Sequence, residues 1–378
     1  MKRIEALDML RGYALVCIML DHMPIGVLRN LTLTNFTTFD AAELFVLLSG
    51  FLVGMVWVKV EQRHGRRAAQ WRFLRRAYEV WLALILGAVL LAAFSHLLFL
   101  LKLNHTAVWF QYSRWLFENP AGYIATVALM WMQPNLLDVL ALYVLLIATA
   151  PFTVPFLLRA PLTAMTVSLA VWFWAEPLNA LIPNQRPGPG LLFNPFGWQL
   201  LFFIGVALGA FRDRLVPVLR RHGGLLNMVS VAILLFSLAV VVAWRLGEPA
   251  RQVAAILKQV HGSIDKWSLD GLRLASILAA SWLVAVPLAP AFAWMARTMP
   301  GQGLAEIGRG GLWSFVSCVL LSIWGDALDM TVPPGTGQTV IRILIDIWVI
   351  VALGVSAAVW LRRDQWLAPI RARLTPPG

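Results

Sequence analysis

Ten long apolar runs divide this chain, and they restrict its fold more than any other feature of the sequence. A helix needs about 20 predominantly apolar residues to cross the roughly 30 Å hydrocarbon core of a bilayer. Most of the runs reach that length, although the fifth and sixth are short for a full crossing. We therefore expect an all-α, polytopic transmembrane helix bundle of about ten spans, forming a single integral membrane domain over residues 1–378. The runs lie at approximately 10–28, 40–58, 78–101, 136–158, 161–176, 196–211, 225–246, 269–293, 306–325 and 339–361.

The composition supports the membrane class. Hydrophobic residues make up 60% of the chain and charged residues only 13%, whereas soluble domains carry about 25% charged residues. The first run contains Arg11, Asp21 and His22, so we interpret it as a permanent span and not as a cleaved signal peptide. Both cysteines, Cys17 and Cys318, lie inside apolar runs, and we expect neither a structural disulfide nor a metal site.

Lysine and arginine are distributed unequally between the two sides of the predicted bundle. With the amino terminus inside, the cytoplasmic segments hold 19 of the 31 Lys and Arg residues, and the opposite side holds ten. Residues 59–76 alone hold seven, while Arg11 and Arg309 at inner span ends are counted separately. Because Lys and Arg accumulate in cytoplasmic loops, both termini are predicted to be cytoplasmic. The same distribution explains the net charge of +12 without nucleic-acid binding.

The first run contains the densest set of ionisable residues, in the stretch LDMLRGYALVCIMLDH. Each such group costs roughly 2.5–3.5 kcal/mol to insert into a bilayer, so these residues are functional candidates. Arg11 and His22 are eleven positions apart. In an α-helix this separation is a rotation of about 20° more than three full turns, so both side chains lie on one face of the helix. The same separation places them about 16 Å apart along the helix axis. Asp8 lies one turn before Arg11 and can pair with it. This face suits a long acyl-CoA donor, with its phosphates near Arg11 and its thioester near His22.

A structural interpretation of these residues stays open. In it, Arg11 extends to the inner headgroups, Asp8 neutralises its charge, and His22 lies at the outer interface. For His22 we favour a functional role, because Asp21 lies beside it and an acidic second span follows.

The second run begins DAAELFVLLSGFLVG, with Asp40 and Glu43 at its start. An acid followed three residues later by Glu is typical of a capping box, which accounts for Asp40. Glu43 enters the apolar run, and we expect it to orient His22 and stabilise its charged form, with Asp21 as the alternative partner. Gly50 and Gly54 favour close contact with another helix.

Polar and aromatic side chains near the outer ends of predicted spans are candidates for binding an acceptor substrate: Asp40, Asp138, Tyr143, Trp198 and Gln199. Amides and flat rings suit carbohydrate. Hydrogen bonds between helices are the alternative role for Asp138 and Gln199.

Arginines near the cytoplasmic side are candidates for binding the phosphates of CoA. Arg309 joins Arg11 at a predicted entrance, and Arg72, Arg75 and Arg76 form an outer collar of positive charge. Charge-assisted hydrogen bonds from Arg to phosphate are strong, which is why we single out these residues.

Five stretches spread over most of the chain carry a family resemblance: LDMLRGYALVCIMLDHMP, TTFDAAELFVLLSG, QPNLLDVLALY, FNPFGWQLLFFIGVALG and IGRGGLWSF. They resemble the OpgC family, whose members are associated with succinylating osmoregulated periplasmic glucans, within the type 3 superfamily of membrane acyltransferases. The superfamily's arginine and histidine, with ten residues between them, match Arg11 and His22.

The resemblance implies O-acyl transfer across a bacterial inner membrane. Cytoplasmic acyl-CoA, either succinyl-CoA or acetyl-CoA, is the expected co-substrate, and no permanently bound cofactor is expected. The implied acceptor is a hydroxyl of a periplasmic glucan or another glycan, with His22 as the general base. The lipid bilayer, acyl-CoA and the periplasmic glycan are thus the expected partners, and the oligomeric state is left open.

The competing hypothesis is a lipid or glycan transporter without acyl-transfer chemistry, since ten helices with buried charges also suit transport. Transporters are commonly built from repeats or from helices interrupted at the midplane. No internal repeat is visible in the sequence, and we therefore favour the enzyme.

Overall fold

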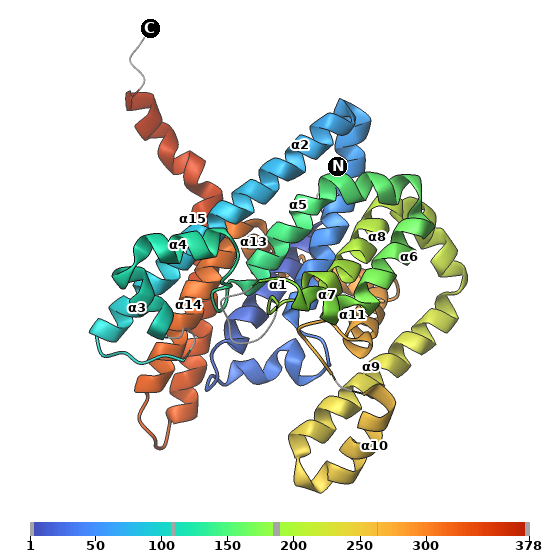
Figure 1. Ribbon diagram of the computed structural model, residues 1–378. Coiled ribbons are helices and arrows are strands. Elements are labelled where there is room, and N and C mark those ends of the chain that lie inside the picture. Colours follow the sequence, from blue (N-terminus) through green and yellow to red (C-terminus); the bar gives the residue numbers. More distant parts are fainter. Residues whose placement is uncertain (1–3, 107–109, 184–189, 263, 375–378) are drawn as a thin grey trace. The chain divides into compact units, whose positions relative to one another are not determined.

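A computed structural model describes residues 4–106, 110–183, 190–262 and 264–374 of the chain (Figure 1). Within these residues the structure contains helices and no β-strands, which confirms the predicted all-α class. Lys2, Arg3 and Arg186, which entered the charge count, lie outside the described residues.

The fold divides into two compact units. Unit 1 comprises Met1–Asn30, Leu97–Ala107 and Pro290–Gly378, and unit 2 comprises Leu31–His96 and Val108–Ala289. Each unit is described by its own contacts, and the single membrane domain expected from the sequence stays a prediction.

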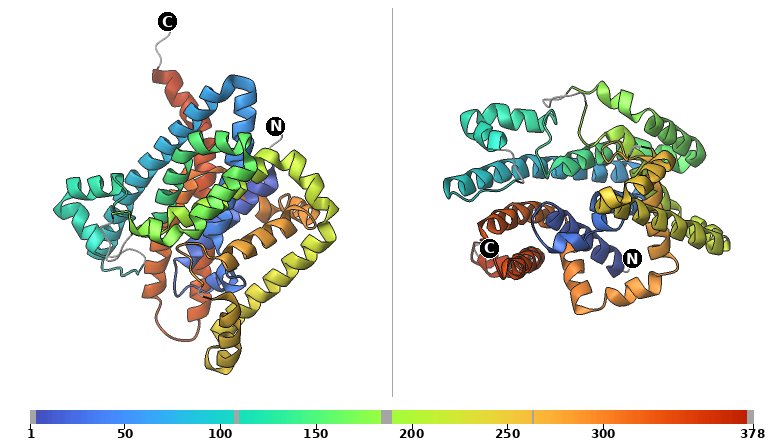
Figure 2. Two further views of the ribbon diagram at one scale, coloured as in Figure 1. Left: turned by 45° about the vertical axis from the view of Figure 1, so that its right-hand side comes forward. Right: turned by 90° about the horizontal axis from the view of Figure 1, so that it is seen from below.

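Unit 1 is built from helices at the two ends of the chain: α1 (Glu5–Asp21), α12 (Ala289–Met295), α13 (Met299–Arg309), α14 (Leu312–Thr331) and α15 (Gln338–Leu374). The first helix packs on α13 and α14, and α14 and α15 lie side by side in both views of Figure 2. Gly12 and Gly308 permit the crossing of α1 and α13, because a Cβ added at Gly12 would lie 1.8 Å from the Leu304 carbonyl oxygen. A Cβ at Gly308 would lie 1.9 Å from the Asp8 carbonyl oxygen.

Unit 2 contains most of α2 (Ala41–Leu100) and the helices that follow it in the chain. These are α3 (Phe110–Glu118), α4 (Pro120–Ala128), α5 (Asp138–Arg159), α6 (Pro161–Phe173), α7 (Ala175–Ala180), α8 (Pro195–Arg221), α9 (Gly223–Leu246), α10 (Arg251–His261) and α11 (Gly271–Ala285). Short 3₁₀ helices are η1 (Leu28–Leu31), η2 (Leu33–Asn35) and η3 (Glu248–Ala250). As predicted, Gly50 and Gly54 allow close packing: a Cβ at either would lie 2.2 Å from a carbonyl oxygen of α8.

Several helices are long and apolar enough to cross a membrane, which supports the predicted membrane class. Among the described residues there are five, or up to six if α11 and α12 together form one span. The expectation of ten spans with both termini in the cytoplasm stays a prediction. The five helices are Ala41–Leu100, Asp138–Arg159, Gly223–Leu246, Leu312–Thr331 and Gln338–Arg363.

The basic segment between the second and third predicted runs is itself helical. The helix α2 continues through residues 59–76 as two arms that meet at Gly65, with φ 80° and ψ 168°. The segment is rich in Arg and also contains Gln and Ala, all strong helix formers, whereas glycine readily adopts a positive φ. The helix turns back on itself at this bend, at the top of Figure 1.

Capping residues explain where several helices begin. Asp40 accepts a hydrogen bond from Ala42 N at 2.8 Å, and Glu43 accepts one from Asp40 N at 3.0 Å. This is the capping box predicted for the start of α2. The Asn194 side chain caps α8 and the Asp270 side chain caps α11 by accepting hydrogen bonds from backbone N–H groups of the first turn. Gly311, with φ 60°, separates α13 from α14, so the predicted run 306–325 is divided between two helices.

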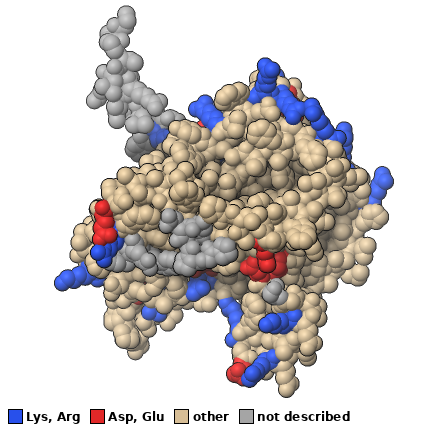
Figure 3. All heavy atoms as spheres, viewed as in Figure 1, with Lys and Arg blue, Asp and Glu red and all other residues tan. Residues whose placement is uncertain are grey.

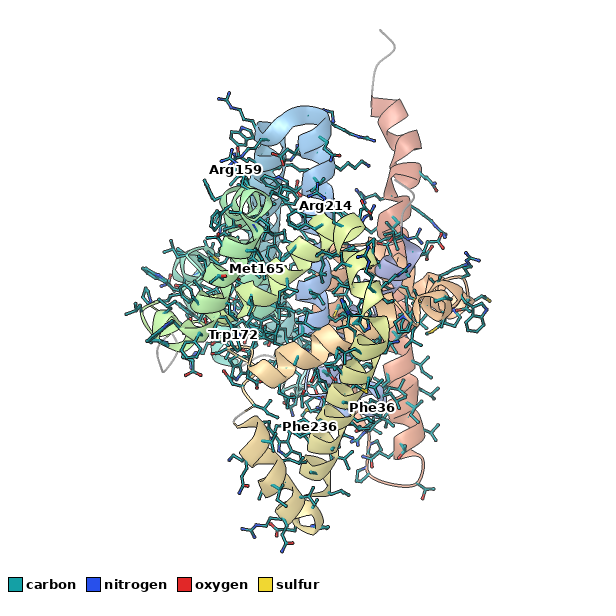
Figure 4. All side chains as sticks on the ribbon, turned by 90° about the vertical axis from the view of Figure 1, so that its right-hand side faces the viewer. Phe36, Arg159, Met165, Trp172, Arg214 and Phe236 are labelled. Carbon is teal, nitrogen blue, oxygen red and sulfur yellow. The ribbon has the colours of Figure 1, made fainter. Side chains whose placement is uncertain are left out.

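Basic residues of the predicted cytoplasmic segments gather at one end of unit 2. Arg159 and Arg214 lie toward the same end as the bend of α2, while Trp172 and Phe36 lie toward the other end (Figure 4). Lys and Arg side chains also gather over the bend in the space-filling view (Figure 3). Within this unit, the arrangement agrees with the charge distribution expected from the sequence.

Candidate functional site

His22 is the residue that follows the last turn of α1. Its Nδ1 lies 2.6 Å from the Ile18 carbonyl oxygen, and the side chain is partly buried. A carbonyl oxygen only accepts, so Nδ1 carries the proton in this hydrogen bond. In the neutral ring Nε2 is then the basic nitrogen, which is the tautomer that a general base needs. The predicted pairing of His22 with Glu43 or Asp21 stays a prediction.

The loop after His22 is held by a carboxylate from the other end of the sequence. Asp346 of α15 is fully buried, and its Oδ2 accepts hydrogen bonds from Val27 N at 2.9 Å and Leu28 N at 2.8 Å. A Cβ added at Gly26 would lie 2.8 Å from Asp346 Oδ1, so the loop backbone passes directly over this side chain. Asp346 therefore fixes the backbone that leaves the candidate base.

Two further buried aspartates, Asp326 and Asp329, lie on α14. Asp326 Oδ2 accepts hydrogen bonds from Thr106 N at 2.6 Å and Thr106 Oγ1 at 3.0 Å. Among the described residues, neither carboxylate oxygen of Asp329 has a hydrogen-bond partner. Gly26 also approaches Asp329, with 3.5 Å between an added Cβ and Oδ2. The loop after His22 therefore rests on more than one buried acid of unit 1.

Arg11 and Arg309 belong to the crossing of α1 and α13. Each directly neighbours one of the glycines that face each other there, Gly12 and Gly308. Arg309 also lies 3.6 Å from the Glu306 carboxylate, and its Nε donates to the Ala305 carbonyl at 3.2 Å. The structure thus brings the two predicted CoA-binding arginines to one helix crossing, although part of the charge of Arg309 is compensated.

Glu43 lies in a buried ionic network of unit 2. Arg273 Nε donates to Glu43 Oε1 at 2.6 Å, and Arg273 Nη2 lies 3.3 Å from Asp40 Oδ2. Glu43 is 0% exposed, and it also holds the Asp40 backbone through the capping box. The contacts of Glu43 in this unit are therefore with Arg273 and Asp40, and its predicted action on His22 stays a prediction.

Lys266, in the loop before α11, completes the network by an ion pair with Asp40 at 2.6 Å. Burial alone lowers the pKa of this ammonium, but the charges of Asp40 and Glu43 outweigh burial and raise the pKa above its ordinary value. Lys266 Nζ also lies 5.7 Å from the ring centroids of Phe193 and Trp267. Asp40, predicted to bind an acceptor, thus has two cationic partners within the protein.

Two of the other predicted acceptor-binding residues, Trp198 and Gln199, are engaged in packing and hydrogen bonds within unit 2. Trp198 is fully buried and its Nε1 donates to the Trp267 carbonyl at 3.0 Å. Gln199 bonds the Ser168 hydroxyl at 2.6 Å and the Ser168 carbonyl at 2.7 Å, so it joins α8 to α6. These contacts agree with the helix-to-helix alternative for Gln199.

Asp138 and Tyr143 lie on α5. Asp138 is only partly buried, and its Oδ1 accepts from Val139 N at 2.9 Å in the first turn. Tyr143 packs edge-on against Phe45 with 5.8 Å between ring centroids. Binding of an acceptor by either residue stays a prediction.

The predicted collar of arginines divides into two groups. Arg75 and Arg76 form ion pairs with Glu79 at 3.3 and 3.2 Å. Arg72 instead lines a cavity with residues from the other arm of α2. The three arginines therefore have different surroundings, and their predicted binding of phosphate stays a prediction.

Sequence reasoning did not single out Arg273, Lys266, Asp326, Asp329 or Asp346. Arg11 and His22 were identified because an ionisable group is costly to place in a membrane span. The same argument applies to Asp346 within the last apolar run and could have identified it. Arg273 was considered only as an outer charge, because its partner lies 230 residues away.

A comparison with known protein families gives a match that covers nearly the whole chain. The sequence pattern of the family described as OpgC protein matches residues 3–365. The chain belongs to the OpgC family. No curated protein and no solved structure gives a significant match. Membership of the OpgC family indicates an acyltransferase-type function on glucans, and the family is generally one of transferases.

Proposed function

We propose that this OpgC family member transfers an acyl group from cytoplasmic acyl-CoA to a hydroxyl of a periplasmic glucan, with His22 as the general base. The observation that carries the proposal is the 2.6 Å contact between His22 Nδ1 and the Ile18 carbonyl. It makes Nε2 the basic nitrogen of an imidazole that ends a predicted membrane helix.

The proposed step is a single acyl transfer. His22 Nε2 accepts the proton of the acceptor hydroxyl as its oxygen attacks the thioester carbonyl. A new C–O bond forms, the C–S bond breaks, and the CoA thiolate leaves with a proton supplied by the imidazolium. General-base catalysis of this kind contributes typically about 10²–10⁴-fold to the rate.

The donor is proposed to enter at the crossing of α1 and α13, where Arg11 and Arg309 neighbour Gly12 and Gly308. Arginine forms bidentate, charge-assisted hydrogen bonds with phosphate. With α1 continuous from Glu5 to Asp21, Arg11 and His22 lie about 16 Å apart along its axis. That span suits a donor whose phosphates and thioester are far apart. Succinyl-CoA is the proposed donor because of the association of the family with glucan succinylation.

The test uses membranes containing the protein, CoA thioesters with a labelled succinyl or acetyl group, and a periplasmic glucan. We expect the label of succinyl-CoA to reach the glucan as a base-labile ester, and His22→Ala membranes to fail. If the wild-type protein moves neither label to carbohydrate, the proposed reaction is wrong. Transport of unmodified glucan by the same membranes would then favour the transporter hypothesis.

A further inference from the structure

The bend of α2 forms an open basic cavity, apart from the crossing of α1 and α13 where the donor is proposed to enter. The cavity has a volume of about 440 Å³ and lies within unit 2. Three cationic side chains line it, Lys59 and Arg63 before the bend and Arg72 after it, together with His64. Figure 4 shows the two arms of α2 joined at the top of the view, and the cavity lies between residues of both arms.

The cavity depends on the backbone at Gly65. Its φ of 80° interrupts the helix and turns the second arm back toward the first. A Cβ added at Gly65 would meet nothing within 4 Å, so the conformation, and not a lack of space, favours glycine there. Because of this bend, Arg72 reaches the same cavity as Lys59, although thirteen positions separate the two residues.

The positive charge of the cavity is not neutralised by neighbouring acids. In the part of the chain that the structure describes, no carboxylate forms an ion pair with Lys59, Arg63 or Arg72. Glu61 is the only acid in residues 59–76, and its Oε2 accepts from Trp57 Nε1 at 2.9 Å. Glu79 pairs with Arg75 and Arg76, further along the second arm.

The remaining walls are apolar. Val56, Val60 and Ala68 line the cavity beside the cations. Lys59 directly follows the predicted second span, so in the predicted orientation we expect the cavity at the depth of the inner lipid headgroups. A site of this kind suits a phosphoryl group whose attached chain is less polar.

We propose that this cavity is a phosphate-binding site. Arg63 and Arg72 supply guanidinium groups from two directions, and Lys59 adds a compact cation. Two sources share the required chemistry: the headgroup of an anionic phospholipid in the inner leaflet and the phosphates of CoA. Occupation by CoA rests on the proposed function, whereas the phosphate site itself does not.

Isothermal titration calorimetry tests the soluble source on the purified full-length protein in detergent. The probes are CoA, 3′-dephospho-CoA and pantetheine, which carries no phosphate. If CoA occupies the cavity, Lys59→Gln and Arg63→Gln should each weaken CoA binding by about tenfold and leave any pantetheine binding unchanged. If the cavity binds the 3′-phosphate of CoA, Lys59→Gln and Arg63→Gln should weaken the binding of 3′-dephospho-CoA less than they weaken the binding of CoA.

Native mass spectrometry tests the lipid source on protein taken from nanodiscs of phosphatidylglycerol or of phosphatidylcholine. If an anionic lipid occupies the cavity, the wild-type protein should retain phosphatidylglycerol, and Lys59→Gln and Arg63→Gln should lose it. Phosphatidylcholine should be retained equally by all variants. The two arms therefore distinguish the sources without measuring acyl transfer.

Arg67→Gln is the matched control, because Arg67 is an exposed cation of the same bend that does not line the cavity. It removes the same charge and should retain both CoA and lipid binding. The thermal unfolding midpoint of each variant checks that it is folded. The proposal is overturned if Lys59→Gln and Arg63→Gln match Arg67→Gln with both probes. If the wild-type protein shows these binding differences from the variants but transfers no acyl group, the result counts against the proposed function alone.

Discussion

Arg273 and Glu43 form a buried ion pair in unit 2, with Arg273 Nε 2.6 Å from Glu43 Oε1 and neither side chain more than 9% exposed. Removing one partner of a buried pair leaves an uncompensated charge, which typically costs about 3–5 kcal/mol. We therefore expect Arg273→Met to lower the free energy of unfolding in detergent by that amount. The double variant Arg273→Met/Glu43→Gln should recover part of the loss.

The control for this prediction is the exposed pair of Arg251 and Glu248, whose side chains are 79% and 83% exposed. Arg251→Met should cost less than about 1 kcal/mol, because water and salt screen exposed pairs. Equal losses for Arg273→Met and Arg251→Met in chemical unfolding would contradict the prediction.

Replacement of His22 should remove catalysis and leave donor binding. We expect His22→Ala and His22→Gln to lower acyl transfer by about 10²–10⁴-fold, because an amide can hydrogen-bond but cannot accept the proton. Affinity for acyl-CoA, measured by calorimetry, should be unchanged. His222→Ala is the matched control, since His222 follows the last turn of α8 as His22 follows that of α1, but is exposed. Near wild-type transfer by His22→Gln would exclude the general base.

Asp346 should act through the loop that follows His22. Asp346→Ala removes the acceptor for Val27 N and Leu28 N, and leaving buried donors unsatisfied costs roughly 1–3 kcal/mol per group. We expect lower stability and a lower kcat for transfer, with little change in KM for acyl-CoA. Asp346→Asn keeps one acceptor oxygen and should lose less of both. If the Asn and Ala variants are equally impaired, these hydrogen bonds do not explain the effect.

Two glycines of α13 should respond oppositely to alanine. A Cβ at Gly308 would lie 1.9 Å from the Asp8 carbonyl oxygen, so Gly308→Ala should force α1 and α13 apart and lower the unfolding midpoint. A Cβ at Gly303 would meet nothing within 4 Å. Gly303→Ala should be neutral or stabilise by roughly 0.5–1 kcal/mol, because alanine favours helix. A similar midpoint for both variants would refute the close crossing of the two helices.

The orientation of the chain is open to direct measurement. Because the segments predicted to be cytoplasmic hold most of the Lys and Arg, reporter fusions after Arg67 and Arg221 should be active in the cytoplasm. A fusion after Asn119 should be active in the periplasm. A periplasmic signal at Arg67 would reverse the predicted orientation.

Local patterns in the sequence determined the class of protein and several of its details. The apolar runs predicted an all-α membrane protein, and the spacing of Asp40 and Glu43 predicted the capping box that the structure contains. The glycines of the second run predicted close helix contact, which Gly50 and Gly54 make with α8. Each of these features depends on residues close together in the chain, where periodicity and propensity act directly.

Only the tertiary structure decided the partners of the charged groups. Arg273 reaches Glu43 across 230 positions, and Asp346 reaches Leu28 across 318. Gln199, a candidate for binding carbohydrate, bonds Ser168 of a neighbouring helix. A buried charge requires a partner, but many residues along the chain could satisfy it. Which one does so depends on how the helices pack, and no local pattern of the sequence contains that information.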